Sequence, residues 1–90
     1  MDLGEFIELI PSASYLDVYV HSRKSKSSRD VRRRVISLGQ AGRILYASRQ
    51  HRAGNPAYAY GYEDRLALPV VALDYVCGVY VIEVTEGGAS

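Results

Sequence analysis

The clearest pattern in the chain is a strict alternation of aliphatic with polar or aromatic residues over positions 15–21. A period of two, built from β-branched and aromatic side chains, predicts a β-strand with one buried and one open face. The aliphatic side chains would face the core, whereas Tyr19 and His21 would lie on the open face.

The segment before this strand has apolar residues at intervals of three to four positions. Residues 2–10 show that spacing between Asp2, a residue type that caps helices, and Pro11, which cannot continue one. The pattern predicts a short helix, which we interpret as an N-terminal appendage that covers residues 1–13.

The helical interval returns after a polar loop in residues 22–28. Ser27 and Asp30 have the spacing of a helix-capping box, and aliphatic residues then recur every three to four positions with arginines between them. We therefore expect an amphipathic helix with a basic outer face over residues 29–42, which ends near Gly39.

The second half of the chain predicts four further elements, which are three strands and one helix. Residues 43–49 have the composition of a second strand, residues 50–56 contain turn-forming Gly, Asn and Pro, and residues 58–62 alternate tyrosine with small side chains as in a third strand. Residues 63–78 predict a second helix, and residues 79–84 predict a last, largely apolar strand.

These elements follow the order β-α-β-β-α-β. That order is typical of a ferredoxin-like α+β fold, in which four strands form an antiparallel sheet and both helices cover one face. We expect a single domain over residues 14–86, followed by a disordered tail over residues 87–90. The uncovered face of the sheet would then be the place where a ligand binds.

The net charge of +1 conceals a strongly basic middle third. Residues 21–52 carry ten Lys and Arg against a single acid, a balance of +9, whereas residues 1–20 and 53–90 each carry −4. Such a segment attracts polyanions, because each phosphate that it neutralises releases condensed counterions. A solvated helix face without a ligand is the alternative that stays open.

The sequence gives little indication of a disulfide, a metal site or a membrane-spanning segment. The single Cys77 forms neither an internal disulfide nor a thiolate cluster for zinc, and His21 and His51 have no acid at metal-ligand spacing. No apolar run reaches the length of a membrane span, and the acidic N-terminus lacks the pattern of a signal peptide. We therefore expect an intracellular protein that binds rather than catalyses, without a cofactor, a metal or a membrane.

Two strand signatures give the sequence a family likeness. The predicted first strand contains Val18-Tyr19-Val20, and the predicted third strand contains Ala57-Tyr58-Ala59-Tyr60. Gly42-Arg43-Ile44 leads into the predicted second strand, and Tyr62-Glu63-Asp64 begins at the end of the predicted third strand. With these motifs at this separation, residues 15–86 resemble a divergent RNA recognition motif.

The resemblance implies that three tyrosines lie side by side on two central strands and stack on bases of single-stranded RNA, or of single-stranded DNA. The predicted nucleic-acid site consists of these rings and of polar or basic side chains around them: Tyr19, Tyr58, Tyr60, His21, Arg23, Lys24, Lys26, Arg29, Arg49 and Arg52. The sequence departs from the family's pattern at Pro56-Ala57, where a basic residue and a glycine are usual.

Several alternatives stay open. A register shift of one residue would turn the tyrosines of residues 58–62 into the core. Exposed tyrosines also anchor protein interfaces, so a protein-interaction module, and a homodimer through the open sheet face, is the second hypothesis. Two further hypotheses are a helix-turn-helix around Gly39 and Gly42 and a ferredoxin-like regulatory domain that binds a ligand.

Overall fold

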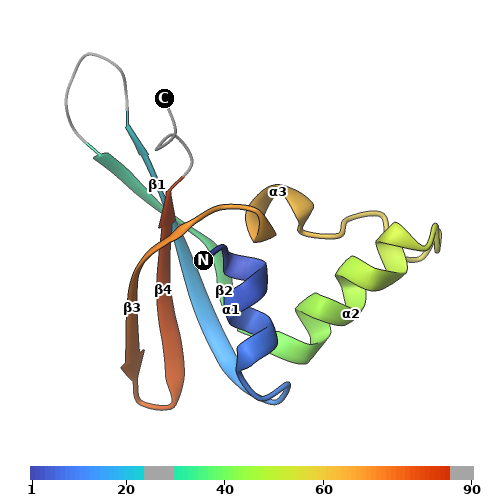
Figure 1. Ribbon diagram of the computed structural model, residues 1–90, viewed down its shortest axis with the longest axis horizontal. Coiled ribbons are helices and arrows are strands. Elements are labelled where there is room, and N and C mark those ends of the chain that lie inside the picture. Colours follow the sequence, from blue (N-terminus) through green and yellow to red (C-terminus); the bar gives the residue numbers. More distant parts are fainter. Residues whose placement is uncertain (24–29, 86–90) are drawn as a thin grey trace.

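A four-stranded sheet with helices on one side makes up the fold of the computed structural model, which describes residues 1–23 and 30–85 (Figure 1). The elements in chain order are α1 (Leu3–Leu9), β1 (Tyr15–Arg23), β2 (Asp30–Gln40), α2 (Ala41–Arg52), α3 (Glu63–Leu66), β3 (Val70–Val76) and β4 (Val79–Thr85). None of the helices in this described part of the chain is long and apolar enough to cross a membrane.

The sheet joins two antiparallel hairpins through a parallel pair of central strands. The strand order is β2-β1-β4-β3, so β1 and β2 form one hairpin and β3 and β4 form the other. β1 and β4 run parallel in continuous register, from Tyr15 opposite Val79 to His21 opposite Thr85. Parallel neighbours need a long crossover, and the chain between the two hairpins contains α2 and α3.

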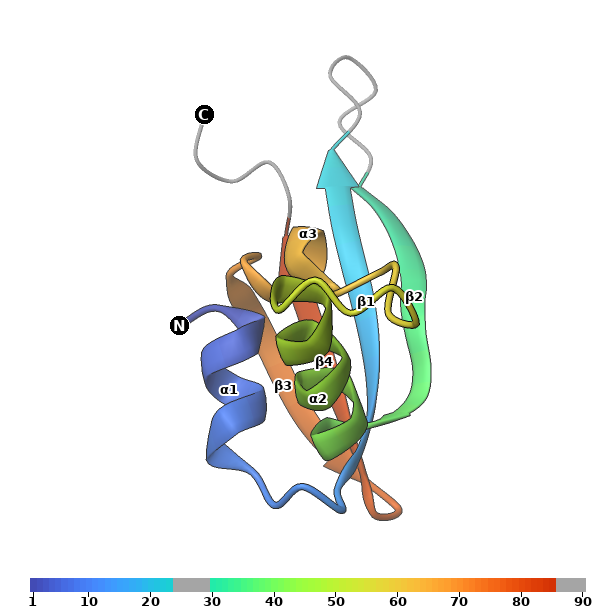
Figure 2. The ribbon, with the colours of Figure 1, turned by 90° about the vertical axis from the view of Figure 1, so that its right-hand side faces the viewer.

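An apolar core lies between the sheet and the helices α1 and α2 (Figure 2). The inward residues of β1 and β4 alternate with outward ones and are almost fully buried. The buried apolar residues are Leu3, Phe6, Ile7, Leu16, Val18, Val20, Ile36, Ala41, Ile44, Ile82 and Val84. The sheet face opposite these helices is called the open face below.

Part of the predicted architecture is confirmed. The protein is α+β with a four-stranded sheet, an N-terminal helix, a strand that begins at Tyr15 and a strand that begins at Val79. The predicted β-α-β-β-α-β order and the antiparallel sheet are wrong, because the observed order is α-β-β-α-α-β-β and the central pair is parallel. Leu3 and Ile7 of α1 are fully buried, so this helix belongs to the core.

The predicted helix over residues 29–42 is wrong, because residues 30–40 form the strand β2. Two register shifts place extra residues in β2 opposite β1, as β-bulges do. The partners of Leu16 and Val18 are therefore Gly39 and Ile36, which are three positions apart instead of two. An interval of three imitates the spacing of a helix, which is why the sequence pattern favours the wrong element.

The predicted second strand, residues 43–49, belongs to helix α2. The buried side chains of α2 are Ala41, Ile44 and Ser48, which recur at helical intervals. The first two backbone N–H groups of the helix donate to carbonyl oxygens of the loop between α1 and β1, at 2.9 and 2.8 Å. Tertiary contact thus satisfies donors that the Gln40 side chain does not cap.

The predicted third strand, residues 58–62, lies in the loop between α2 and α3. Gly61 is buried against α2, and a Cβ atom there would lie 2.7 Å from a ring carbon of His51. Tyr62 adopts a left-handed backbone conformation with a φ of 61°. The small side chain at position 61 therefore reflects close packing against α2 and not the pleat of a strand.

The predicted second helix, residues 63–78, is confined to the four residues of α3, and β3 follows it. β3 is rich in β-branched valine, which favours strands. Cys77 and Gly78 have positive φ values of 51° and 80° and form the two-residue turn of the β3–β4 hairpin. Gly78 thus marks a hairpin turn, where the sequence pattern indicates the end of a helix.

A capping box begins α1. The Glu5 N–H donates to Oδ1 of Asp2 at 2.8 Å, and the Asp2 N–H donates to Oε1 of Glu5 at 2.9 Å. Asp2→Ala is expected to lower the free energy of unfolding by about 1 kcal/mol, because a backbone donor loses its acceptor. Chemical denaturation measures the change, with Asp2→Asn as the control that keeps a capping oxygen. An Asp2→Ala variant as stable as the parent chain would contradict this role of the box.

Candidate nucleic-acid interface

Side chains of three neighbouring strands meet on the open face. Tyr19 alternates with buried valines on β1, so its ring points away from the helices. On β2, Arg34 lies opposite Tyr19 and Arg32 lies opposite His21. On β4, Glu83 lies beside Tyr19. We call these five residues, Tyr19, His21, Arg32, Arg34 and Glu83, the Tyr19 cluster.

Two guanidinium groups accompany the Tyr19 ring. The Cζ atom of Arg32 lies 3.8 Å from the ring centroid, and the Cζ atom of Arg34 lies 6.0 Å from it. Both distances are within the range of cation–π attraction. The open face therefore presents an aromatic ring with one cation over it and a second cation at its side.

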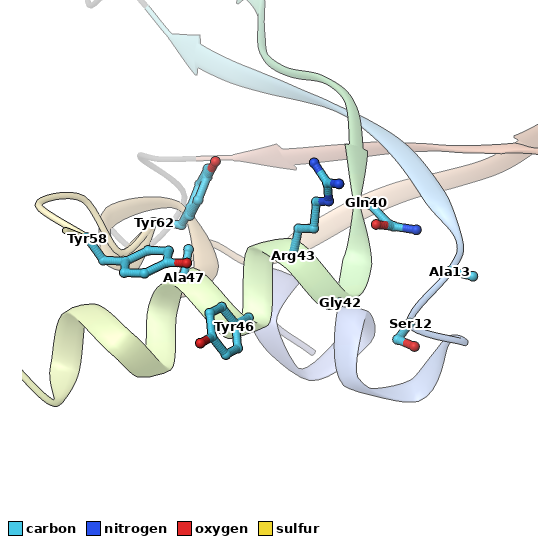
Figure 3. Close-up of a pocket in the computed structure, with 9 residues that line it drawn as sticks. All are labelled: Ser12, Ala13, Gln40, Gly42, Arg43, Tyr46, Ala47, Tyr58 and Tyr62. Atoms are coloured by element: carbon cyan, nitrogen blue, oxygen red, sulfur yellow. The ribbon is translucent and has the colours of Figure 1, made fainter. Parts of the chain in front are cut away.

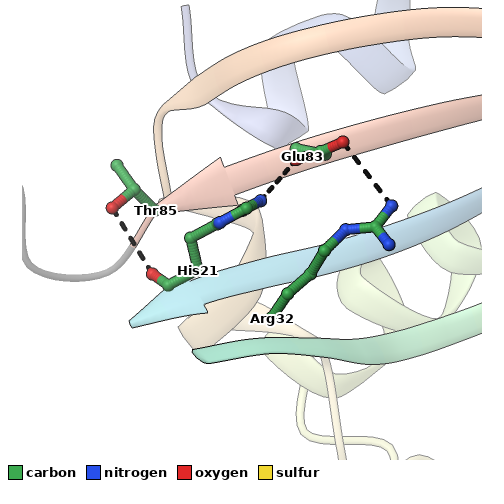
Figure 4. Close-up of polar contacts among 4 residues, drawn as sticks. All are labelled: His21, Arg32, Glu83 and Thr85. Carbon is green, nitrogen blue, oxygen red and sulfur yellow. Dashed lines mark hydrogen bonds and ion pairs between the residues drawn. The ribbon is translucent and has the colours of Figure 1, made fainter. Parts of the chain in front are cut away.

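Glu83 links the basic part of the cluster to His21 (Figure 4). Its Oε1 contacts Nε2 of His21, and its Oε2 lies 3.5 Å from Nη2 of Arg32. The Thr85 hydroxyl donates to the carbonyl oxygen of His21 at 3.4 Å. Because the paired side chains are partly exposed, each ion pair adds only about 0–1 kcal/mol to stability. The main effect of Glu83 is geometric, since it holds Arg32 beside Tyr19.

Tyr58 and Tyr60 do not lie beside Tyr19. Both belong to the loop between α2 and α3, so the predicted row of three rings on two central strands is wrong. The Tyr58 ring packs edge-to-face against Tyr46 of α2, with ring centroids 5.6 Å apart. The Tyr60 hydroxyl donates to Oδ1 of Asp64 at 2.7 Å. Partial desolvation, together with this hydrogen bond, raises the pKa of Tyr60 to about 12.

The predicted cations divide into separate groups. Arg49 and Arg52 are exposed on α2, across the sheet from Tyr19. The backbone of Arg23 ends β1, where it lies opposite Asp30 of β2. Three predicted residues lie outside the described part of the chain: Lys24, Lys26 and Arg29. Of the predicted site, the structure therefore brings together Tyr19 and His21 and separates them from the arginines of α2.

Arg32, Arg34 and Glu83 are members of the cluster that the sequence pattern does not single out. The two arginines fall in the segment with helical spacing, where they are expected on the outside of a helix. In a strand, residues 32 and 34 lie on the same face, and this spacing of two is the sequence feature that indicates their common position. Glu83 offers no local signal, because its contact with His21 depends on the parallel pairing of β1 with β4.

A groove on the helix side of the sheet is a second candidate site (Figure 3). It has a volume of about 660 Å³, and its lining includes Tyr46, Tyr58, Tyr62 and Arg43. Arg43 extends from α2 between these tyrosines and Gln40. Among its described lining residues the groove offers rings for stacking but a single cation, whereas two guanidinium groups accompany Tyr19 on the open face.

Neither a metal-binding group nor a known relative indicates the function of these two sites. No three His, Cys, Asp or Glu side chains of residues 1–23 and 30–85 are grouped so that they would hold a metal ion. No family model, no curated protein and no solved structure matches the chain. The function therefore has to be inferred from the chemistry of the open face and of the groove.

Proposed function

We propose that the open face binds single-stranded nucleic acid, RNA in the first place, at the Tyr19 cluster. The observation that carries this proposal is the Tyr19 ring with the Arg32 guanidinium 3.8 Å from its centroid and Arg34 nearby. Unpaired bases stack on aromatic rings and on guanidinium planes, and guanidinium groups also bind phosphates bidentately. The cluster offers all of these contacts on one face of the sheet.

The charge around the cluster supports a polyanionic ligand. β2 presents three exposed arginines in succession, Arg32, Arg33 and Arg34. Residues 22–34 of the sequence carry seven Lys and Arg against Asp30. A single strand that crosses this region gains affinity from each phosphate that releases its counterions.

Each member of the cluster has its own part in this mode of binding. A base stacks on the Tyr19–Arg32 pair, and Arg34 donates to the adjoining phosphate. Glu83 keeps Arg32 in place, and its carboxylate is able to accept from the amino group of a base. His21 offers a ring nitrogen to a 2′-hydroxyl, which is the group that distinguishes RNA from DNA.

Of the two signatures that resemble the RNA recognition motif, only Val18-Tyr19-Val20 lies on a strand, the central strand β1, so the proposal rests on Tyr19 and not on the likeness as a whole. Tyr58 and Tyr60 are left out of the proposed interface, because they lie in the loop against α2. Four basic residues remain proposed phosphate contacts on the ground of their charge alone: Arg23, Lys24, Lys26 and Arg29.

Tyr19→Ala is expected to weaken the binding of a short single-stranded RNA by roughly 5- to 150-fold, which corresponds to the loss of one stacked base. Fluorescence anisotropy with labelled RNA and DNA oligonucleotides of about ten nucleotides, at low and at moderate salt, measures the affinity. Tyr58→Ala is the matched control, because it removes the same side chain from the other side of the sheet and should leave the affinity almost unchanged.

The two tyrosine variants separate the possible results. Equal losses in Tyr19→Ala and Tyr58→Ala would contradict a site confined to the open face. A loss in Tyr58→Ala alone would move the site to the groove along α2. If the parent chain bound neither RNA nor DNA at low salt, the proposed function would be rejected.

A further inference from the structure

β3 forms one edge of the sheet and exposes apolar side chains along its length. Among the described strands it pairs with β4 alone, and every residue of β3 after Val70 is exposed. Val71, Leu73 and Tyr75 expose 58, 51 and 60% of their surfaces. Such an edge offers unpaired backbone groups together with an apolar surface, which is what strand addition by another chain requires.

The other edge of the sheet is protected against strand addition, in contrast to β3. β2 carries the successive residues Arg32, Arg33 and Arg34, and its ladder with β1 has two irregularities. Charged side chains and bulges are the usual means by which proteins block edge-to-edge association. β3 has one irregularity, between Val70 and Ala72, but its residues 72–76 pair regularly with β4, contain no Lys, Arg or Pro, and carry Asp74 as their single charge.

The N-terminal residues cover only the beginning of the β3 edge. The Leu3 N–H donates to the Leu68 carbonyl oxygen at 2.9 Å, and the Val70 N–H donates to the Met1 carbonyl oxygen at 3.0 Å. Asp2 forms an isolated bridge with Pro69 between these two bonds. The edge beyond Val70 has no such partner among residues 1–23 and 30–85.

The hairpin geometry indicates which backbone groups of this edge point outward. In a two-residue hairpin the flanking residues, here Val76 and Val79, exchange both backbone hydrogen bonds. The backbone groups of Tyr75 and Leu73 are therefore directed away from β4. The Tyr75 N–H agrees with this direction, because it donates to Oδ1 of the adjacent Asp74 at 2.8 Å.

We propose that β3 pairs with the β3 strand of a second copy of this chain, antiparallel about a two-fold axis at Leu73. In this register Leu73 lies opposite itself, Val71 lies opposite Tyr75, and Ala72 lies opposite Asp74. The two four-stranded sheets then join into one continuous sheet. This dimer differs from the predicted homodimer through the open sheet face, and it does not depend on nucleic-acid binding.

The residues of β3 are complementary to themselves in this register. Leu73 and Tyr75 lie opposite Ile82 and Tyr80 of β4, so they share the helix side of the sheet and form an apolar row across the axis. Asp74 meets Ala72 of the other copy, so that no like charges face one another. Self-complementarity of this kind is what a two-fold interface between identical chains requires.

Pairing of β3 with β2 of another copy is the competing arrangement. It would bring Asp74 near arginines, but the two irregularities of β2 make it a poor template for the regularly paired residues 72–76 of β3. Head-to-tail pairing also leaves one free edge of each kind at every step, so it would produce open chains of growing length. The two-fold arrangement closes at two copies.

Analytical ultracentrifugation of the full chain tests this dimer. The expected result is a rise from the mass of one chain to twice that mass, and no further, between about 10 µM and 1 mM. Leu73→Lys should remain monomeric over the whole range, because it places two ammonium groups opposite each other at the axis. The matched control is Leu38→Lys, which alters a leucine that is 58% exposed on β2 and should leave the dimer intact.

Several results would overturn the dimer. They are a parent chain that stays monomeric at the highest concentration, a mass that grows beyond two copies, and equal effects of the two lysine substitutions. Circular dichroism of Leu73→Lys must show a folded protein. A further variant, Asp74→Ala, frees the outward N–H of Tyr75 and should shift the association to lower concentrations; weaker association of this variant would also count against the proposal.

A distance measurement tests the register independently of mutation in the interface. Cys77 is the single cysteine and is exposed in the turn at the end of β3. In the proposed register the two Cys77 residues are about 27 Å apart, from four residues of strand rise on each side of Leu73. Nitroxide labels on Cys77 should give a pulsed EPR distance of roughly 20–35 Å. A distance well outside this range in a dimeric sample would rule out the register.

Discussion

Ile82→Ala is expected to lower the free energy of unfolding by about 2–5 kcal/mol, the largest loss of stability that we predict. Ile82 is fully buried on β4, a central strand, where it lies opposite Val18 of β1 and Leu73 of β3. Truncation to alanine leaves a cavity between the sheet and the helices, because close-packed neighbours relax only in part. Since small domains are marginally stable, a loss of this size is a large share of the total.

Val81→Ala is the matched control for Ile82→Ala in chemical denaturation. Val81 precedes Ile82 on β4, faces the other side of the sheet and is only partly buried, so its truncation should cost less than about 1 kcal/mol. A larger loss of stability for Val81→Ala than for Ile82→Ala would mean that Val81, and not Ile82, faces the core. In that case Glu83, and with it the Tyr19 cluster, would not lie opposite the core.

The double substitution Arg32→Ala/Arg34→Ala is expected to lower both the nucleic-acid affinity and its dependence on salt. If each arginine neutralises one phosphate, the slope of log affinity against log salt falls by about 1.4 for a single strand. At roughly 0.1 M salt this corresponds to about a 25-fold weaker binding, before the loss of the cation over Tyr19 is added. Anisotropy titrations at a series of salt concentrations measure both the affinity and the slope.

Arg43→Ala/Arg52→Ala is the matched control for this double substitution. It removes the same charge from exposed positions on α2, across the sheet from the Tyr19 cluster. We expect its salt slope to stay close to that of the parent chain. Equal losses in the two double variants would mean that binding follows the net charge of the protein, and the assignment to the open face would fail.

Elements with regular local geometry were predictable from the sequence. β1 has an unbroken alternation in residues 15–21 and pairs with β4 without a register shift, so its faces follow from the sequence. The capping residue type Asp2 and the apolar spacing of residues 2–10 likewise predict α1, and the structure forms a capping box there. In these segments, local pattern and tertiary environment favour the same conformation.

Elements shaped by bulges and tertiary contacts were not predictable in this way. The extra residues in β2 turn a period of two into an interval of three, which is the signal of a helix. In the Tyr-Ala-Tyr-Gly-Tyr segment, Gly61 packs against His51 and Tyr58 packs against Tyr46, and neither contact is visible in a local window. The predicted topology is wrong for the same reason, because it depends on the order of the predicted elements.

The residues of the candidate site also differ in whether a local sequence pattern predicts them. Tyr19 and His21 follow from the alternation of β1. Their partners come from β2 and from β4, and Glu83 is 62 positions away from His21 in the sequence. A contact of that kind depends on the parallel pairing of the two hairpins, for which the sequence carries no local signal.

An NMR titration of the isotope-labelled chain with a single-stranded RNA of about ten nucleotides is the most direct test of the proposed interface. We predict that the shift changes concentrate on the open face, at Tyr19, His21, Arg32, Arg34 and Glu83, and leave α2 and the loop after it nearly unchanged. Changes concentrated instead on Arg43, Tyr46 and Tyr58, or no changes at low salt, would contradict the assignment of nucleic-acid binding to the Tyr19 cluster.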